Sequence, residues 1–291
     1  MSQLFGIIFS LGALFSWAFG DFNIQRSTRA FGIWKSLFYI GIFGFAILLP
    51  FVWSDLPAVF SNKNELLLLI ITSFVVVWAG QFNFLGLKNG KFSVIMPLTG
   101  LELPITIIVS VIFVGDRISW LEGCVMSMVF LGLMLLVVKG QGVKISKENL
   151  EKGVLYGLLG ALGLALVNVL IGLSSRATSP LVAIWFTHTF AALYCAVVLL
   201  WKKEFKSFKQ DFVKNTKSLL YGSILDNFAW LCFAYATTFI SIAIATTISE
   251  CFIAVGALLG MTINHEKLKK RQVAGMVIAI LGVIILSVLA G

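Results

Sequence analysis

Four carboxylates within the long apolar runs of this 291-residue sequence could do chemistry: Glu102, Glu250, Asp226 and Asp21. A carboxylate costs a few kcal/mol in hydrocarbon even on lenient insertion scales, so each is expected to meet a partner or a ligand. Glu102 and Glu250 lie near the middle of their runs, where this cost is highest. The chemistry that such groups offer is binding of an ammonium ion or carriage of a proton.

Tryptophan accompanies two of the acids at helical spacing. Trp230 follows Asp226 by four positions and Trp17 precedes Asp21 by four, so each pair shares a helix face. An indole ring beside a carboxylate suits an ammonium group, which gains cation–π attraction as well as ion pairing. For the deep residues Trp78 and Trp230, ordinary helix packing is an equal alternative to cavity lining.

Further polar side chains occur in the same runs. Asn83 is a candidate ligand contact, and His188 is a candidate proton carrier because imidazole exchanges protons near neutral pH. An interhelical hydrogen bond is the alternative for both. The residues predicted to bind solute are Glu102, Glu250, Asp226, Trp78, Trp230, Trp185, Tyr235 and Asn83, and those predicted to carry a proton are Glu102, Glu250 and His188.

The elements that must position these residues are membrane-spanning helices. Of all residues, 59% are hydrophobic and 12% charged, which excludes a water-soluble globular domain. A helix needs about 20 mostly apolar residues to cross the hydrocarbon, and its backbone amides must be paired internally. Ten runs qualify: 4–23, 36–53, 66–87, 92–114, 119–138, 153–173, 181–201, 218–238, 240–262 and 273–290.

The basic residues indicate the orientation. Of the 22 Lys and Arg residues, 19 fall in the connections that follow the odd-numbered runs, and only Lys63, Arg117 and Arg176 fall on the other side. The positive-inside rule therefore predicts a multi-pass protein of the cell membrane with both termini extracytoplasmic. Orientation accounts for the net charge of +9, which removes the case for a nucleic-acid partner.

The two halves of the chain echo each other. Asp116-Arg117-Ile118 with Leu131-Gly132 recurs 150 residues later as Glu266-Lys267-Leu268 with Leu281-Gly282. The repeats are predicted at 1–138 and 153–291, joined by a cytoplasmic loop at 139–152. Five runs per half is an odd number, so the second copy must be inverted in the membrane. Inverted repeats usually place a solute site near mid-depth between the halves.

These half-ending segments, with Trp17-Ala18-Phe19-Gly20 and the Pro97/Pro104 pair, resemble the EamA-type members of the drug/metabolite transporter superfamily. The resemblance covers nearly the whole chain. It implies an all-α membrane protein with ten transmembrane helices in two inverted five-helix repeats, which moves small metabolites by alternating access. Residues 248–256 contain no proline, a departure that puts in doubt any hinge assigned to that helix by analogy.

The acids favour a secondary transporter of a small amine-bearing solute, either an organic cation such as a quaternary ammonium or an amino acid. Proton coupling and the direction of transport stay open. The mid-run segments hold no Lys or Arg, which disfavours phosphate-bearing solutes. The alternatives are an exporter of aromatic amino acids or amphipathic drugs, a channel, and a membrane enzyme that modifies lipids.

The remaining expectations concern cofactors and partners. The sequence has no GxxxxGK[ST] motif, and its four cysteines show no metal-ligand spacing. We therefore expect no enzymatic activity, catalytic residues, metal or cofactor. The expected partners are the solute, the bilayer and, if transport is coupled, protons. A monomer and a homodimer are both compatible with two repeats in one chain.

Overall fold

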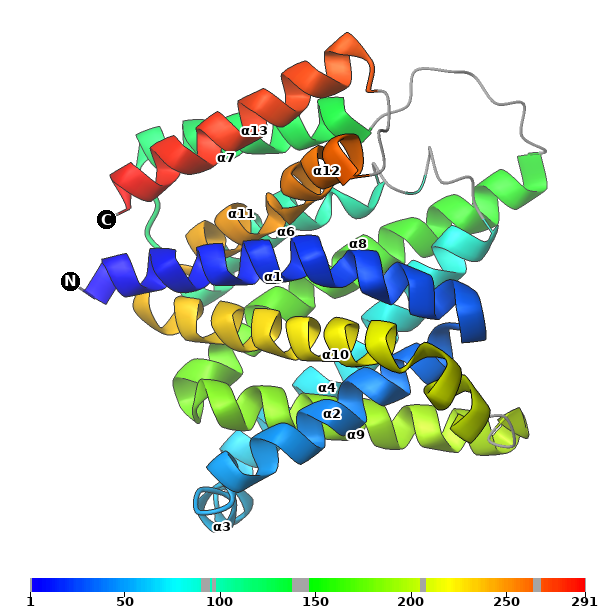
Figure 1. Ribbon diagram of the computed structural model, residues 1–291. Coiled ribbons are helices and arrows are strands. Elements are labelled where there is room, and N and C mark those ends of the chain that lie inside the picture. The colour runs from blue at the N-terminus through cyan, green and yellow to red at the C-terminus, as the bar shows by residue number, and fades with distance from the viewer. Residues whose placement is uncertain are drawn as a thin grey trace.

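The computed structural model describes residues 2–89, 95, 98–137, 147–204, 208–263 and 268–290, apart from the side chains at 21–31, 84, 87–89, 147–151, 208–212, 214–215 and 263. In this part of the chain the regular elements are helices (Figure 1). They are α1 (Ser2–Phe31), α2 (Ile33–Val52), α3 (Leu56–Ser61), α4 (Lys63–Asn89), α6 (Glu102–Val109), the π-helical turn η1 (Ser110–Val114), α7 (Trp120–Val137), α8 (Lys147–Ala177), α9 (Pro180–Trp201), α10 (Phe208–Phe239), α11 (Ile242–Glu250), α12 (Phe252–Ile263) and α13 (Lys270–Leu289).

Eight segments within the described residues are long and apolar enough to cross a membrane. They correspond to eight of the ten expected runs. Of the run at 92–114, residues 102–114 form a shorter apolar helix, and residues 92–94 and 96–97 lie outside the described residues. The run at 218–238 is helical within α10, but Asp226 and Asn227 interrupt its apolar character. The chain is thus a helical protein with multiple membrane spans.

Two connections are shorter than expected. The loop expected at 139–152 overlaps α8, which begins at Lys147, and residues 139–146 lie outside the described part. The connection expected at 202–217 is helical from Phe208 onward. Apolar length therefore predicts where a helix crosses the membrane, whereas the helix itself can extend into water.

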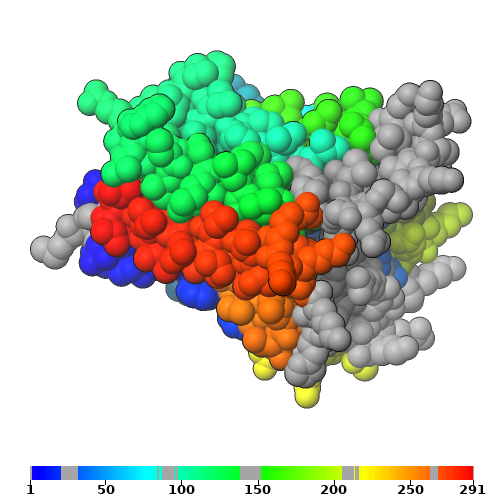
Figure 2. Space-filling view, turned by 90° about the horizontal axis from the view of Figure 1, so that it is seen from above, coloured from blue at the N-terminus to red at the C-terminus, as the bar shows by residue number. Residues whose placement is uncertain are grey.

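Four close, antiparallel helix pairs organise the bundle: α1 with α10, α4 with α8, α2 with α9, and α7 with α13. Each pair joins a helix from the first half of the chain with one from the second half. Figure 2 shows α7 and α13 side by side across one face of the molecule. The outer sides of this pair expose Leu131, Ile284 and Val288, as expected for helices in contact with lipid.

Small residues permit the close approach within these pairs. A Cβ added at Gly132 would lie 2.8 Å from the backbone nitrogen of Ala279, and one added at Gly163 would lie 2.9 Å from Cα of Ala79. Lipid supplies little hydrophobic force between helices, so association depends on van der Waals contact and hydrogen bonds at short range. Gly132 and Gly282, which recur in the two halves of the sequence, thus both lie at helix contacts.

Gly44 of α2 provides a test of this close packing. A Cβ at this position would clash with Oδ1 of Asn227 and lie 2.8 Å from Nδ1 of His188. We expect Gly44→Ala to lower the free energy of unfolding by about 1–3 kcal/mol because the buried side chains cannot move aside. Thermal unfolding of the purified protein in detergent measures the change.

Gly80→Ala on α4 is the matched control, because no atom of the described residues lies within 4 Å of an added Cβ there. Alanine at this helical position should leave the unfolding midpoint unchanged or raise it slightly. Equal midpoints for the two variants would contradict the packing that we describe for Gly44.

Candidate functional site

The first predicted acid, Glu102, lies where a helix begins. The chain turns at residues 100–101, and α6 starts at Glu102. The amide of Leu101 donates to the carbonyl of Leu98 over 3.1 Å, an interval of three residues instead of the four of an α-helix. Pro104 has no N–H, so the carbonyl of Gly100 lacks its usual helical partner. The interruption places Glu102 at the start of the new helix.

The second predicted acid, Glu250, lies at a matching interruption. It is the last residue of α11, Cys251 forms the turn, and α12 begins at Phe252. The amide of Cys251 donates to Ile248 over 3.3 Å, again across three residues. The sequence cast doubt on a hinge here because it lacks proline, but the tightened turn interrupts the helix without one. The thiol of Cys251 contacts the carbonyl of Ala279 at 3.6 Å, which anchors the turn on α13.

The two acids meet in the interior. The α6 helix packs against both α8 and α11. Asn168 of α8, only 3% exposed, donates from Nδ2 to Oε1 of Glu102 over 2.9 Å. The carboxyl group of Glu250 also lies in hydrogen-bonding range of Glu102. A hydrogen bond between two carboxyl groups needs a proton on one of them, so this cluster can hold a proton or exchange it for another cation.

Two buried threonines adjoin the acids, and the sequence reasoning did not select them. Thr106 follows Glu102 by one helical turn, and Thr246 precedes Glu250 by one turn. Both are fully buried, and their hydroxyls have no hydrogen-bond partner among the described residues. Spacing of four residues from each acid was the only signal in the sequence. Buried hydroxyls that lack a partner are unusual and add polar capacity beside the acids.

Aromatic side chains lie close to the Glu250 turn. Trp17 of α1 and Trp230 of α10 pack edge to face, with ring centroids 5.0 Å apart. Trp17 also contacts Phe252, two residues after Glu250, at 5.9 Å. Trp230 is half-buried. Trp17 thus contacts both the predicted residue Trp230 and the start of α12, which follows Glu250, and spacing alone did not indicate these contacts.

Other predicted residues lie in separate contacts. Trp78 packs edge to face with Phe82 at 5.1 Å. Tyr235 stacks on Phe9 at 5.1 Å. Trp185 is buried against Phe45, and its indole N–H has no partner among the described residues.

Two predicted polar residues lie at helix contacts. Asn83 of α4 faces Gly160 of α8, where a Cβ would lie 2.9 Å from the Cα of Asn83. Asp226 is half-buried on α10, beside the contact of that helix with Gly20 of α1. The side chain of Asp21 lies outside the described residues.

His188 belongs to a different hydrogen-bond network. Its Nδ1 lies 2.7 Å from Oδ1 of Asn227, whose Nδ2 donates to the carbonyls of Ile40 at 3.0 Å and Ser223 at 2.8 Å. Because Nδ2 is the donor, Oδ1 accepts, and Nδ1–H of His188 must donate. The network ties α9, α10 and α2 together, so these contacts give His188 a structural role alongside the predicted proton role.

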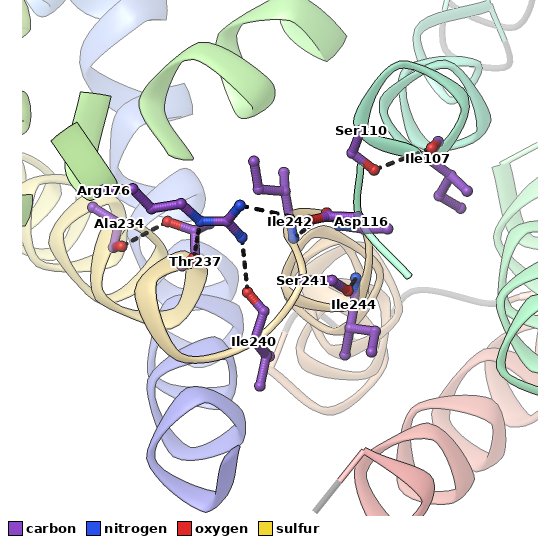
Figure 3. Close-up of polar contacts among 11 residues, drawn as sticks. Ile107, Ser110, Asp116, Arg176, Ala234, Thr237, Ile240, Ser241, Ile242 and Ile244 are labelled. Atoms are coloured by element: carbon purple, nitrogen blue, oxygen red, sulfur yellow. Dashed lines mark hydrogen bonds and ion pairs between the residues drawn. The ribbon is translucent and has the colours of Figure 1, made fainter. Parts of the chain in front are cut away.

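An ion pair joins the halves at one end of the bundle, which we call the terminal face because Gln3 and Ala290 lie there with Asp116 and Arg176. Figure 3 shows the pair, with Nη1 of Arg176 3.5 Å from Oδ1 of Asp116. Asp116 appeared in the sequence only as part of a repeat and Arg176 only as a loop charge. A cavity of about 470 Å³ adjoins the pair.

Comparison with known proteins identifies related chains. The profile of the EamA-like transporter family matches residues 4–138 and again 151–288. An "Uncharacterized transporter" of Archaeoglobus fulgidus is 23% identical over 285 residues, which cover 96% of this chain and 97% of that protein. An "Uncharacterized transporter" of Helicobacter pylori is 27% identical over 136 residues, covering 46% of this chain and 45% of that protein.

A solved structure described as "Crystal structure of protein" has the same fold. It superposes with a TM-score of 0.76 at 14% sequence identity, over 98% of this chain and 97% of that one.

Asn227 offers a test of the His188 network. Asn227→Ala removes the acceptor of His188 and leaves a buried N–H without its partner. We expect the free energy of unfolding to fall by about 1–3 kcal/mol. Thermal or denaturant unfolding in detergent measures the loss. The exposed Asn64, changed to Ala, is the control and should stay within about 0.5 kcal/mol of the parent. If the network does not contribute to stability, Asn227→Ala and Asn64→Ala will have the same free energy of unfolding.

Proposed function

Starting from the fact that this chain belongs to the EamA-like transporter family, we propose that it moves a small amine-bearing solute by alternating access. Membership, with the transporter names of its relatives, makes the chain a membrane transporter of the drug/metabolite type and not an enzyme. The lipid-modifying alternative is therefore set aside. The solute proposed is an organic cation, such as a quaternary ammonium, or an amino acid.

The observation that carries this proposal is the cluster of Glu102, Glu250 and Asn168. Its two carboxyl groups come from interrupted helices in the two halves of the chain, and a buried amide holds one of them. Interrupted helices that meet near mid-depth are where transporters of this kind bind solutes. An ammonium group placed there would gain two negative partners, which supports a cationic or zwitterionic solute.

The same cluster supports proton exchange. The two carboxyl groups share at least one proton when they bond to each other, and an arriving ammonium group would compete for the same oxygens. Binding would then release the proton, and return of the proton would release the solute. We propose that solute and proton alternate at Glu102 and Glu250 in this way, with His188 as a further proton carrier.

Several observations support ten helices in two inverted five-helix repeats. The family profile matches the two halves separately. If each helix is replaced by the helix at the same position in the other half, the pair of α1 with α10 becomes the pair of α8 with α4. The pairs α2 with α9 and α7 with α13 each join helices at the same position in the two halves. The two ends of the chain lie near each other (Figure 1), as an even number of crossings requires, and residues near both ends line one cavity. We assign the repeats to 1–138 and 153–291, on either side of the 139–152 connection.

The basic residues support the cell membrane with an extracytoplasmic terminal face. Lys202 and Lys203 follow α9, and Lys269, Lys270 and Arg271 surround the start of α13, whose other end lies at the terminal face. The positive-inside rule places such clusters in the cytoplasm. Either a monomer or a homodimer could operate in this orientation.

A second candidate is export of aromatic amino acids or amphipathic drugs. The contact of Trp17 with both Trp230 and Phe252, beside Glu250, supports it. Stacking on these rings would then contribute more than the acids. The further predicted contacts, Trp78, Trp185, Tyr235, Asp226 and Asn83, remain candidates for either solute class.

The acids themselves give the first test. Glu102→Gln and Glu250→Gln should each reduce solute counterflow in proteoliposomes at least about tenfold, because the neutral amide removes ion pairing and proton exchange. Glu65→Gln is the matched control, since this half-buried acid near the start of α4 accepts a hydrogen bond from Asn62 that glutamine can also accept. Parent rates for both central variants would refute the central site. Absence of counterflow in a parent that still conducts would favour a channel.

Ligand-induced stabilisation distinguishes the two solute classes. A screen of the purified protein over quaternary ammonium compounds, amino acids and aromatic drugs should yield hits that raise the melting temperature by mass action. Amine solutes should lose this effect in Glu102→Gln and release protons into a weakly buffered solution on binding to the parent. Hits confined to neutral aromatic compounds, unaffected by Glu102→Gln, would favour the second candidate.

A further inference from the structure

We propose that the Asp116–Arg176 ion pair is a gate, and that it closes a buried polar path leading from Glu102 and Glu250 to the terminal face. This inference rests on the proposed function, since a gate implies a solute path. It concerns residues that neither the sequence repeat nor the central acids identify as functional.

The pair holds several chain segments together at one point (Figure 3). Oδ2 of Asp116 accepts from the amides of Ile242 at 2.7 Å and Ala243 at 3.3 Å, at the start of α11. Nε and Nη2 of Arg176 donate to the carbonyls of Thr237 at 2.7 Å and Ile240 at 3.2 Å, around the end of α10. The α10–α11 corner is thus fixed by a carboxylate from the first half and a guanidinium from α8.

A line of buried polar residues runs from the acids toward this pair. Thr106 and Ser110 follow Glu102 at intervals of one helical turn, and the amide of Asp116 donates to the carbonyl of Ser110 over 3.1 Å. On the facing helix, Thr246 lies one turn from Glu250 and one turn from Ile242, whose amide Asp116 binds. Thr106, Ser110 and Thr246 are fully buried, on two helices that pack together.

The two threonine hydroxyls indicate what this line is for. Neither has a partner among the described residues, although a buried hydroxyl without one is unfavourable. Water or a polar solute would supply the missing partners if the path opened. Ser110, in contrast, donates to the carbonyl of Ile107 over 3.1 Å. The unfilled hydrogen-bonding capacity thus lies between the acids and the ion pair.

The position of the pair allows it to open. The side chain of Asp116 is 6% exposed and that of Arg176 is 32% exposed, beside the cavity of about 470 Å³. That cavity is also lined by Thr238, Ser241 and Ile244, which belong to the corner held by the pair and the helix that follows. The cavity therefore gives access to the pair from the terminal face, and Asp116 also contacts Ser110 and Ile242, from which the buried polar line starts.

The sequence supports a role tied to the repeat. Asp116 has its counterpart 150 residues later in Glu266, and the same interval separates Arg26 from Arg176. An acidic residue and an arginine, which together could form an ion pair, thus each recur 150 residues apart, the interval of the repeat. The side chains of Arg26 and Glu266 lie outside the described residues, and the proposal uses only the pair at the terminal face.

Cysteine accessibility tests the gate without any solute. Thr246→Cys and, in a second variant, Thr106→Cys are prepared in lipid nanodiscs with and without Asp116→Asn, and treated with a water-soluble maleimide. Asparagine keeps the shape but loses the ion pair, so we expect labelling of the introduced thiol to quicken about tenfold. Mass spectrometry of peptides reads each site separately, so the native cysteines can stay.

Cys232 is the internal control, because it is buried between α1 and α10, away from the path. Its labelling should not change with Asp116→Asn. Arg176→Gln should reproduce the effect, and the double variant should add little, because the two residues act as a unit.

Two outcomes would overturn the gate. Unchanged labelling of both introduced cysteines in Asp116→Asn would show that the pair does not close the path, and an equal rise at Cys232 would show general loosening of the fold. The result is independent of the solute. Suppose that Glu102→Gln leaves transport intact while Asp116→Asn still speeds labelling of Thr246→Cys. The central site is then refuted and the gate is supported.

Discussion

The organising constraint of this protein is that two half-buried carboxyl groups, one from each half of the chain, meet inside a bundle of apolar helices. Glu102 and Glu250 can share that space only if protons, the amide of Asn168 or a bound cation compensate their charge. Interrupted helices allow the two carboxyl groups to approach each other, because each acid lies at a helix end and not in the middle of a continuous helix. The rest of the bundle then has to hold two broken helices without losing its packing.

Close antiparallel helix pairs satisfy that requirement. Gly132, Gly160 and Gly163 let backbones approach to distances at which any side chain would collide. The partners come from opposite halves of the chain, so neither half completes its contacts alone. A polar network at His188 and Asn227 adds directional bonds to α2, α9 and α10. The helices that surround the broken ones are therefore held together by close packing and by directional hydrogen bonds.

Closure at the terminal face uses another kind of interaction. Asp116 and Arg176 bind backbone groups at helix ends, where carbonyls and amides lack helical partners. Such contacts can break and reform without repacking a hydrophobic surface. A transporter needs this separation, because an interface of interlocked glycines cannot open for each solute, whereas a partly exposed ion pair can.

Sequence alone determined the membrane class and the resemblance to a transporter family, because hydropathy is a local property. The mid-depth position of Glu102 and Glu250 and the pairing of Trp230 with Asp226 stay predictions. Tertiary structure alone decided that Asn168 binds Glu102, that Trp17 packs on Trp230, that His188 bonds to Asn227, and that Asp116 meets Arg176. These contacts join residues far apart in the chain. Their spacing in the sequence does not predict them, because the packing of one helix against another decides which side chains meet.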